Sequence, residues 1–143
     1  MPTISRYFLK TGLIWLILSV LILLLRHGAA AEGIGVSDAA LRILFYHTLT
    51  VGWITQIIMG VSIWMFPRYS PTSRRGPEYY WWAVYVLLNA GLILRSSIEP
   101  FGAYHDHTFL SVLLVSAGWI KALACTIYAV LIWRRVANPR KRP

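Results

Sequence analysis

Four long apolar stretches constrain the fold of this chain more than any other feature. They run from about residue 7 to 25, 39 to 66, 79 to 97 and 109 to 133. Because a helix crosses a bilayer with about 20 mostly apolar residues, each stretch is long enough to span a membrane. Only 13% of the residues are charged, about half the share found in soluble domains. The sequence therefore predicts an all-α integral membrane protein, folded as a single four-helix up-and-down bundle.

The first apolar stretch has a second interpretation, as a secretory signal peptide. Arg6 and Lys10 form a basic start, and the alanines at 29–31 resemble a cleavage site. Arg26 and His27 separate the apolar run from those alanines, however. We therefore expect an uncleaved spanning helix.

The basic residues predict the orientation of the bundle. One side of the predicted spans carries Arg6, Lys10, Arg68, Arg74, Arg75, Arg134, Arg135, Arg140, Lys141 and Arg142, and the other side only Arg26, Arg42 and Arg95. Because cytoplasmic segments carry the excess of Lys and Arg, both termini are expected in the cytoplasm, with 134–143 as a basic tail. The expected location is the inner (plasma) membrane. The net charge of +9 thus fits contact with anionic lipids, and we expect no nucleic-acid partner.

His47, in the outer part of the second stretch, is the most informative polar residue. A histidine inside a spanning helix is a functional candidate, and a neutral imidazole is a common axial ligand of haem iron. Gly52 and Gly60 thin the same helix, so that a porphyrin ring or a neighbouring helix can approach it. The alternative is an interfacial histidine bonded to a carbonyl group or to water.

His105 and His107 flank Asp106 just before the fourth stretch. Two histidines so spaced point the same way in extended chain and can hold copper or zinc, or they belong to an ordinary polar loop. As a second haem ligand we prefer His107, with His105 next. Its depth fits poorly, because His47 lies 21 residues before Arg68 whereas His107 lies 27 before Arg134. That six-residue excess corresponds to about 9 Å of helix.

Arg42 and Arg95 lie near the outer ends of the second and third stretches. Both are candidates for binding haem propionates, because a guanidinium group matches a carboxylate with two parallel hydrogen bonds. A lipid headgroup contact, or an ion pair between Arg95 and Glu99, is the alternative.

Lys121 lies in the middle of the fourth stretch, 12 residues from both Phe109 and Trp133. A lysine at that depth is costly unless it meets polar partners or water. Gln56 and Asn89 lie at compatible depths in the second and third stretches. These residues predict an intramembrane polar cluster that locks the bundle or a partner subunit. A proton-carrying site is the alternative.

The second stretch resembles part of subunit I of the haem-copper oxidases, most closely the nitric-oxide-reductase branch. The shared features are Arg42, the pair His47-Thr48, Trp53, Gly60 and the closing Pro67-Arg68. A second similar segment runs from Asn89-Ala90-Gly91 through Arg95 to Glu99-Pro100, and is shared with small four-helix proteins related to that subunit. The resemblance implies that His47 is an axial ligand of a low-spin b-type haem near the outer face.

The resemblance covers residues 42–68, with spacing about one residue different from the reductase pattern. The chain shows no counterpart of the histidines that bind copper and the active-site haem in that family. By this resemblance it is not a complete oxidoreductase on its own.

Three hypotheses follow. The first is a protein that binds haem b and serves in electron transfer, haem handling or sensing. The second is a haem-free accessory subunit of a respiratory membrane complex, in which Lys121, Gln56 and Asn89 serve helix association. The third is metal trafficking through His105 and His107. The expected partners are the lipid bilayer and a second copy or a larger respiratory complex.

Overall fold

The computed structural model describes residues 1–32, 38–66, 77–102 and 108–136, and all regular structure in these ranges is helical. The elements are α1 (Thr3–Glu32), α2 (Asp38–His47), the π-helical segment η1 (Thr48–Thr55), α3 (Gln56–Met65), α4 (Glu78–Gly102) and α5 (Thr108–Val136). Because α2, η1 and α3 follow one another without a break, they form one long helix. In the described ranges four helices are therefore long and apolar enough to cross a membrane, as predicted.

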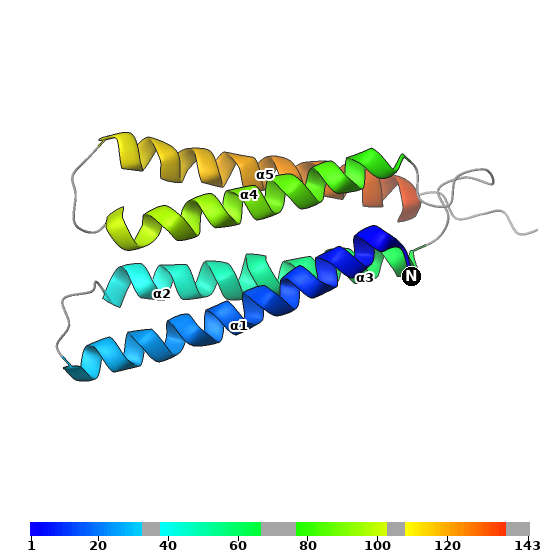
Figure 1. The fold of residues 1–143 in the computed structure, drawn as a ribbon. Helices are drawn as coiled ribbons and strands as arrows, with labels where there is room; N and C mark the ends of the chain where they lie inside the picture. Colours follow the sequence, from blue (N-terminus) through cyan, green and yellow to red (C-terminus); the bar gives the residue numbers. More distant parts are fainter. Residues whose placement is uncertain (33–37, 67–76, 103–107, 137–143) are drawn as a thin grey trace, which may run out of the picture.

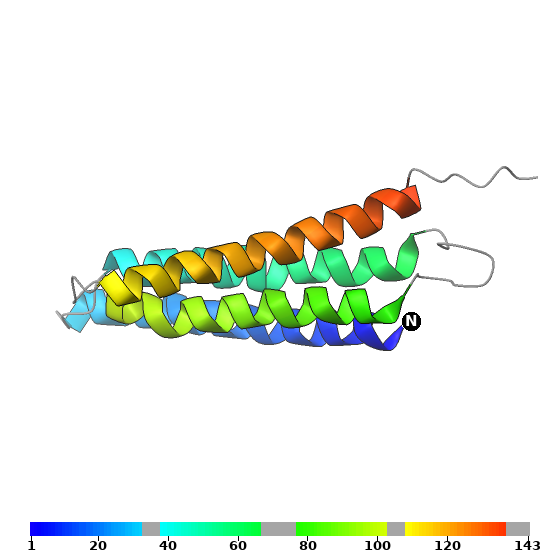
Figure 2. The same ribbon diagram turned by 90° about the horizontal axis from the view of Figure 1, so that it is seen from above.

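The four long helices run antiparallel to their neighbours in the chain (Figure 1). Helix α1 packs along the continuous helix α2–η1–α3, and α5 packs along α4. Figures 1 and 2 show the N-terminus and the end of α5 at the same end of the bundle, which we call the terminal end. The opposite end, where α1 ends and α2 begins, is the distal end.

The helices at both ends of the bundle are longer than the apolar stretches. Helix α1 continues to Glu32, through a run of alanines, which are the strongest helix formers. Helix α4 continues through Pro100 to Gly102, although the sequence predicts an end at Glu99-Pro100. A proline in the last turn removes only one backbone hydrogen bond, and the ion pair between Arg95 and Glu99 spans the same turn.

The last turn of α5 occupies the position where the sequence predicts the start of a basic tail. Arg135 in this turn is only 2% exposed. Its guanidinium group donates to the carbonyl oxygens of Ile63 (3.2 Å) and Phe66 (2.5 Å) and lies 5.9 Å from the ring centre of Trp81. The carbonyl groups at the end of α3 lack partners within their own helix, so Arg135 supplies them. It thereby joins α5 to α3 at the terminal end.

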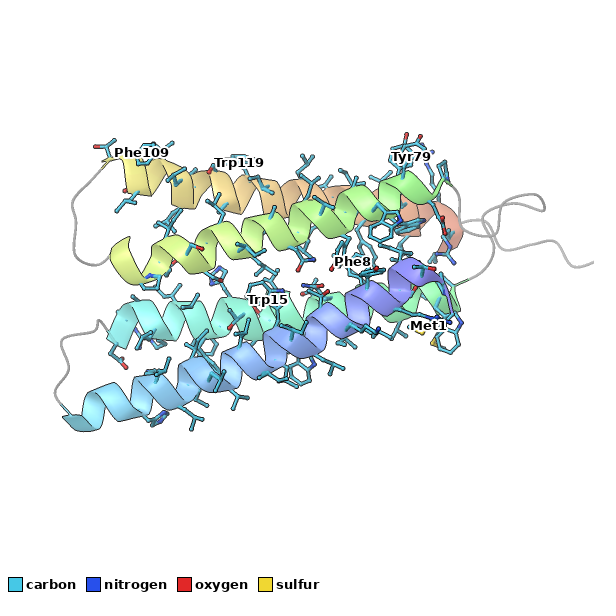
Figure 3. The ribbon with its side chains drawn as sticks, in the orientation of Figure 1. Met1, Phe8, Trp15, Tyr79, Phe109 and Trp119 are labelled. Atoms are coloured by element: carbon cyan, nitrogen blue, oxygen red, sulfur yellow. The ribbon has the colours of Figure 1, made fainter. Side chains whose placement is uncertain are left out.

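The apolar core lies toward the terminal end. All four long helices contribute buried residues to it, namely Ile4, Phe8, Met59, Ile63, Trp81, Val84, Leu88 and Ala124. In Figure 3, Phe109 and Trp119 instead point away from the bundle on the outer side of α5, and both are at least 70% exposed. Since lipid covers the outside of a membrane bundle, polar residues in the middle of the chain's spans must find partners inside it.

Helix α1 covers both glycines of the second span. A Cβ atom on Gly52 would lie 2.8 Å from Cβ and Cγ of Trp15, and one on Gly60 would lie 2.9 Å from Cβ of Phe8. Small residues at such crossings let helix backbones approach closely. Of the two occupants considered for these glycines, a neighbouring helix fills the space, and none remains there for a porphyrin ring.

Gly52→Ala is therefore expected to destabilise the bundle by about 1–3 kcal/mol, because Trp15 or the helix backbone has to move. The matched control is Gly118→Ala, since a Cβ there meets nothing within 4 Å. It should leave the stability unchanged or raise it slightly. Unfolding by dodecyl sulfate in maltoside micelles, followed by circular dichroism, measures both. Equal stability of the two variants would contradict the close approach of α1.

Candidate functional site

A network of buried amides crosses the middle of the bundle. Asn89 on α4 accepts hydrogen bonds at Oδ1 from Nε1 of Trp15 (3.0 Å) and from Nε2 of Gln56 (3.0 Å). Its own Nδ2 donates to the carbonyl oxygen of Tyr85 (2.9 Å). Gln56 is fully buried, and Trp15 and Asn89 are less than 10% exposed. The structure thus brings together Gln56 and Asn89, which the sequence places at matching depth.

Trp15 is a member of this network that the sequence analysis missed. Its signal was available, since the indole lies well inside the first apolar stretch and far from either interface. An indole N–H at that depth needs an acceptor. Together the three side chains join α1, α3 and α4.

Lys121 is buried but does not join the amide network. It is 8% exposed, and its Cγ lies where a Cβ atom on Gly91 would be, at 2.7 Å. The absence of a side chain at Gly91 therefore admits the lysine stem against α4. Within the described ranges, no residue lies within hydrogen-bonding or ion-pairing distance of its ammonium group. Arg95 and Glu99 are its charged neighbours, close enough to act electrostatically.

Arg95 and Glu99 form an ion pair on the distal part of α4. Nε of Arg95 lies 2.9 Å from Oε2 of Glu99, and the two side chains are 21% and 10% exposed. The ion pair considered as an alternative for Arg95 is thus present. Arg42, the second candidate for binding propionates, is exposed near the start of α2.

His47 is half-buried at the end of α2. Its Nδ1 lies 3.1 Å from the carbonyl oxygen of Ile43. When Nδ1–H donates to that carbonyl, the lone pair of the ring is on Nε2, as in most histidines that bind a metal. Arg95, Lys121 and Glu99 all lie within electrostatic range of the ring. His47 therefore belongs to the same charged region in the distal half of the bundle.

The π-helical segment η1 begins directly after His47. Thr48, its first residue, is fully buried and donates its hydroxyl to the carbonyl oxygens of Leu44 and Phe45, both at 3.0 Å. In a π-helix each backbone hydrogen bond spans five residues instead of four, and such segments frequently lie at functional sites. The sequence analysis expects a regular α-helix here, because apolar periodicity does not reveal a π segment.

His105 and His107 lie outside the described residues, so the second-ligand and H-x-H predictions stay predictions. In the rest of the chain, as far as the structure describes it, no group of three or more His, Cys, Asp or Glu side chains is arranged to hold a metal ion.

No model of a known protein family, no curated protein and no solved structure matches this chain.

Proposed function

We propose that this chain is a b-type haem-binding membrane protein related to subunit I of the haem-copper oxidases. His47 is the proposed axial ligand, and electron transfer, haem handling or sensing is the proposed role. The supporting observation is the orientation of the His47 ring, whose Nδ1 faces the Ile43 carbonyl at 3.1 Å and leaves Nε2 for iron.

The residues around His47 suit an anionic porphyrin. Haem carries propionate groups, and the cations of Arg95 and Lys121 lie within electrostatic range of the His47 ring. The guanidinium of Arg95 is engaged with Glu99 through Nε, which leaves its two terminal nitrogens as donors. Arg42, which is exposed near the start of α2, is the second proposed propionate ligand. A bound haem would supply one-electron redox chemistry, while the protein sets its ligand, its charge environment and its access to water.

A second axial ligand is proposed from His107 or, failing that, from His105. A histidine of a second copy or of a larger respiratory complex would serve in the same way. The excess depth of His107 favours a ligand brought by the loop before α5 rather than by the helix itself.

The proposed setting is the inner (plasma) membrane, with both termini in the cytoplasm. Two observations support this orientation. The N-terminus and the end of α5 lie at the same end of the bundle (Figure 1), and the basic residues of the sequence gather on that side.

A reduced-minus-oxidised visible spectrum of the protein, purified in mild detergent, tests the proposal. Haem bound by histidine gives sharp b-type bands on reduction, and we expect about one haem per chain. A colourless protein expressed with sufficient haem supply would reject the proposal.

A second candidate function is that of a haem-free accessory subunit of a respiratory complex. Helix α5 supports it, because its backbone packs closely only against α4 among the described helices. Trp119, 11 residues into α5, is 73% exposed near the middle of the span, away from the interfaces that tryptophan prefers. In this function, the amide network of Gln56 and Asn89 and the buried Lys121 serve helix association. Co-purification of a colourless chain with a large membrane complex is the expected result.

A further inference from the structure

The charged groups in the distal half of the bundle do not balance. Arg95 and Glu99 neutralise each other as an ion pair, and Arg26 and Asp38 do the same at 2.6 Å near the distal end. Lys121 has no acidic partner among the described residues. One positive charge is therefore left over inside the bundle.

The depth of Lys121 makes this surplus costly. It lies 13 residues after the start of α5 and 15 before its end, or about 20 Å from each end of the helix. A lysine side chain does not reach water over that distance. Ionised residues at such depth pair with other charges or line a binding site or an ion pathway.

Open space lies beside Lys121 on its own helix. Gly118 precedes it by three residues, so both lie on the same side of α5. A Cβ atom on Gly118 would meet nothing within 4 Å, whereas one on Gly91, across the helix pair, would lie 2.7 Å from Cγ of Lys121. The lysine stem thus fills the position at Gly91, and the position at Gly118 is free.

Arg95 offers further donors to this region. Its ion pair with Glu99 uses Nε, and a guanidinium group has four more N–H donors on its terminal nitrogens. No described residue accepts a hydrogen bond from them. Lys121 and Arg95 therefore present two cations with free donors and a surplus of one charge.

We propose that Lys121 and Arg95 bind the carboxylate of an apolar acid inside the membrane, with its hydrocarbon part beside Gly118. A carboxylate carries the single negative charge that the region lacks. A phosphate monoester carries about −1.5 to −2 at neutral pH and would overcompensate it. The site does not depend on iron at His47, and so goes beyond the proposed function. A free fatty acid and a haem propionate offer the same carboxylate.

Thermal unfolding of the purified protein with decanoate, and separately with decanol, tests this site. Decanoate should raise the midpoint by about 3 °C or more at saturation, and decanol should not. Lys121→Met should abolish the response by removing the charge, and Gly118→Leu by filling the space. Lys10→Met, at an exposed lysine, and Gly28→Leu, at a glycine also open to 4 Å, are the matched controls that keep it.

Haem loading separates the two sources of the carboxylate. If a propionate occupies the site, haem-loaded protein loses the decanoate response that haem-free protein retains. If a free acid is the ligand, both forms respond. A response in a protein that binds no haem would reject the proposed function and leave this site standing. Equal shifts with decanol, or an undiminished decanoate response in Lys121→Met, would reject the site itself.

Discussion

His47→Ala is expected to abolish the b-type absorption bands of the purified protein. If Nε2 of His47 binds iron, its removal leaves at most one axial ligand, and the low-spin spectrum is lost together with most of the bound haem. The matched control is His27→Ala. His27 makes the same local contact as His47, with Nδ1 2.8 Å from the carbonyl oxygen of Leu23, but it is exposed near the end of α1.

Comparison of the two histidine variants separates iron binding from simple loss of a helix contact. Each substitution removes one side-chain bond to the preceding turn, so their stabilities should change similarly. Only the His47 variant should lose colour. Equal loss of haem from both variants, or retention of the bands in both, would exclude His47 as the axial ligand. Addition of imidazole to His47→Ala should restore part of the spectrum if the empty position is on the iron.

Asn89→Leu is expected to destabilise the bundle by about 2–4 kcal/mol. The leucine has a similar volume but no acceptor, so the indole N–H of Trp15 and the amide N–H of Gln56 both lose their partner. An unsatisfied buried donor costs about 1–3 kcal/mol. Single hydrogen bonds between membrane helices average only about 0.6 kcal/mol, and the larger figure here reflects two orphaned donors in a water-free interior.

Removal of the donors as well should recover much of that loss. In the background Trp15→Phe with Gln56→Leu, Asn89→Leu should cost less than about 1 kcal/mol, because no orphaned donor is left. Ser97→Leu is the control on the same helix, since Ser97 is exposed and bonds only to the carbonyl of Ile93. Unfolding by dodecyl sulfate measures the whole set. A cost independent of the background would show that the amide network contributes little.

The four-helix architecture was predictable because the requirement for long apolar helices acts on composition alone. The pairing of Gln56 with Asn89 followed from depth, which residue counting gives along any spanning helix. Counting does not give the rotation of a helix about its axis or the order of helices around the bundle. For that reason Trp15 was missed, and Lys121 was grouped with amides that its helix does not reach.

Other features of the site depend on local geometry that no sequence pattern announces. The burial of Arg135 requires α5 to extend past the apolar stretch and end beside α3. The closeness of α1 to Gly52 was one of two readings, because a glycine reveals that something approaches without revealing what. The π segment after His47 arises from backbone hydrogen bonds among residues that also suit an α-helix.

The π segment has a consequence for how the second span tolerates length changes. Each of its wide turns contains one residue more than an α-helical turn needs. Deletion of a single residue within 48–55 would let the segment close into an α-helix and keep the span continuous. Every side chain on the distal side, His47 included, would then be turned by about 100° around the axis relative to α3. One codon gained or lost here would therefore re-aim an imidazole while leaving the membrane crossing intact.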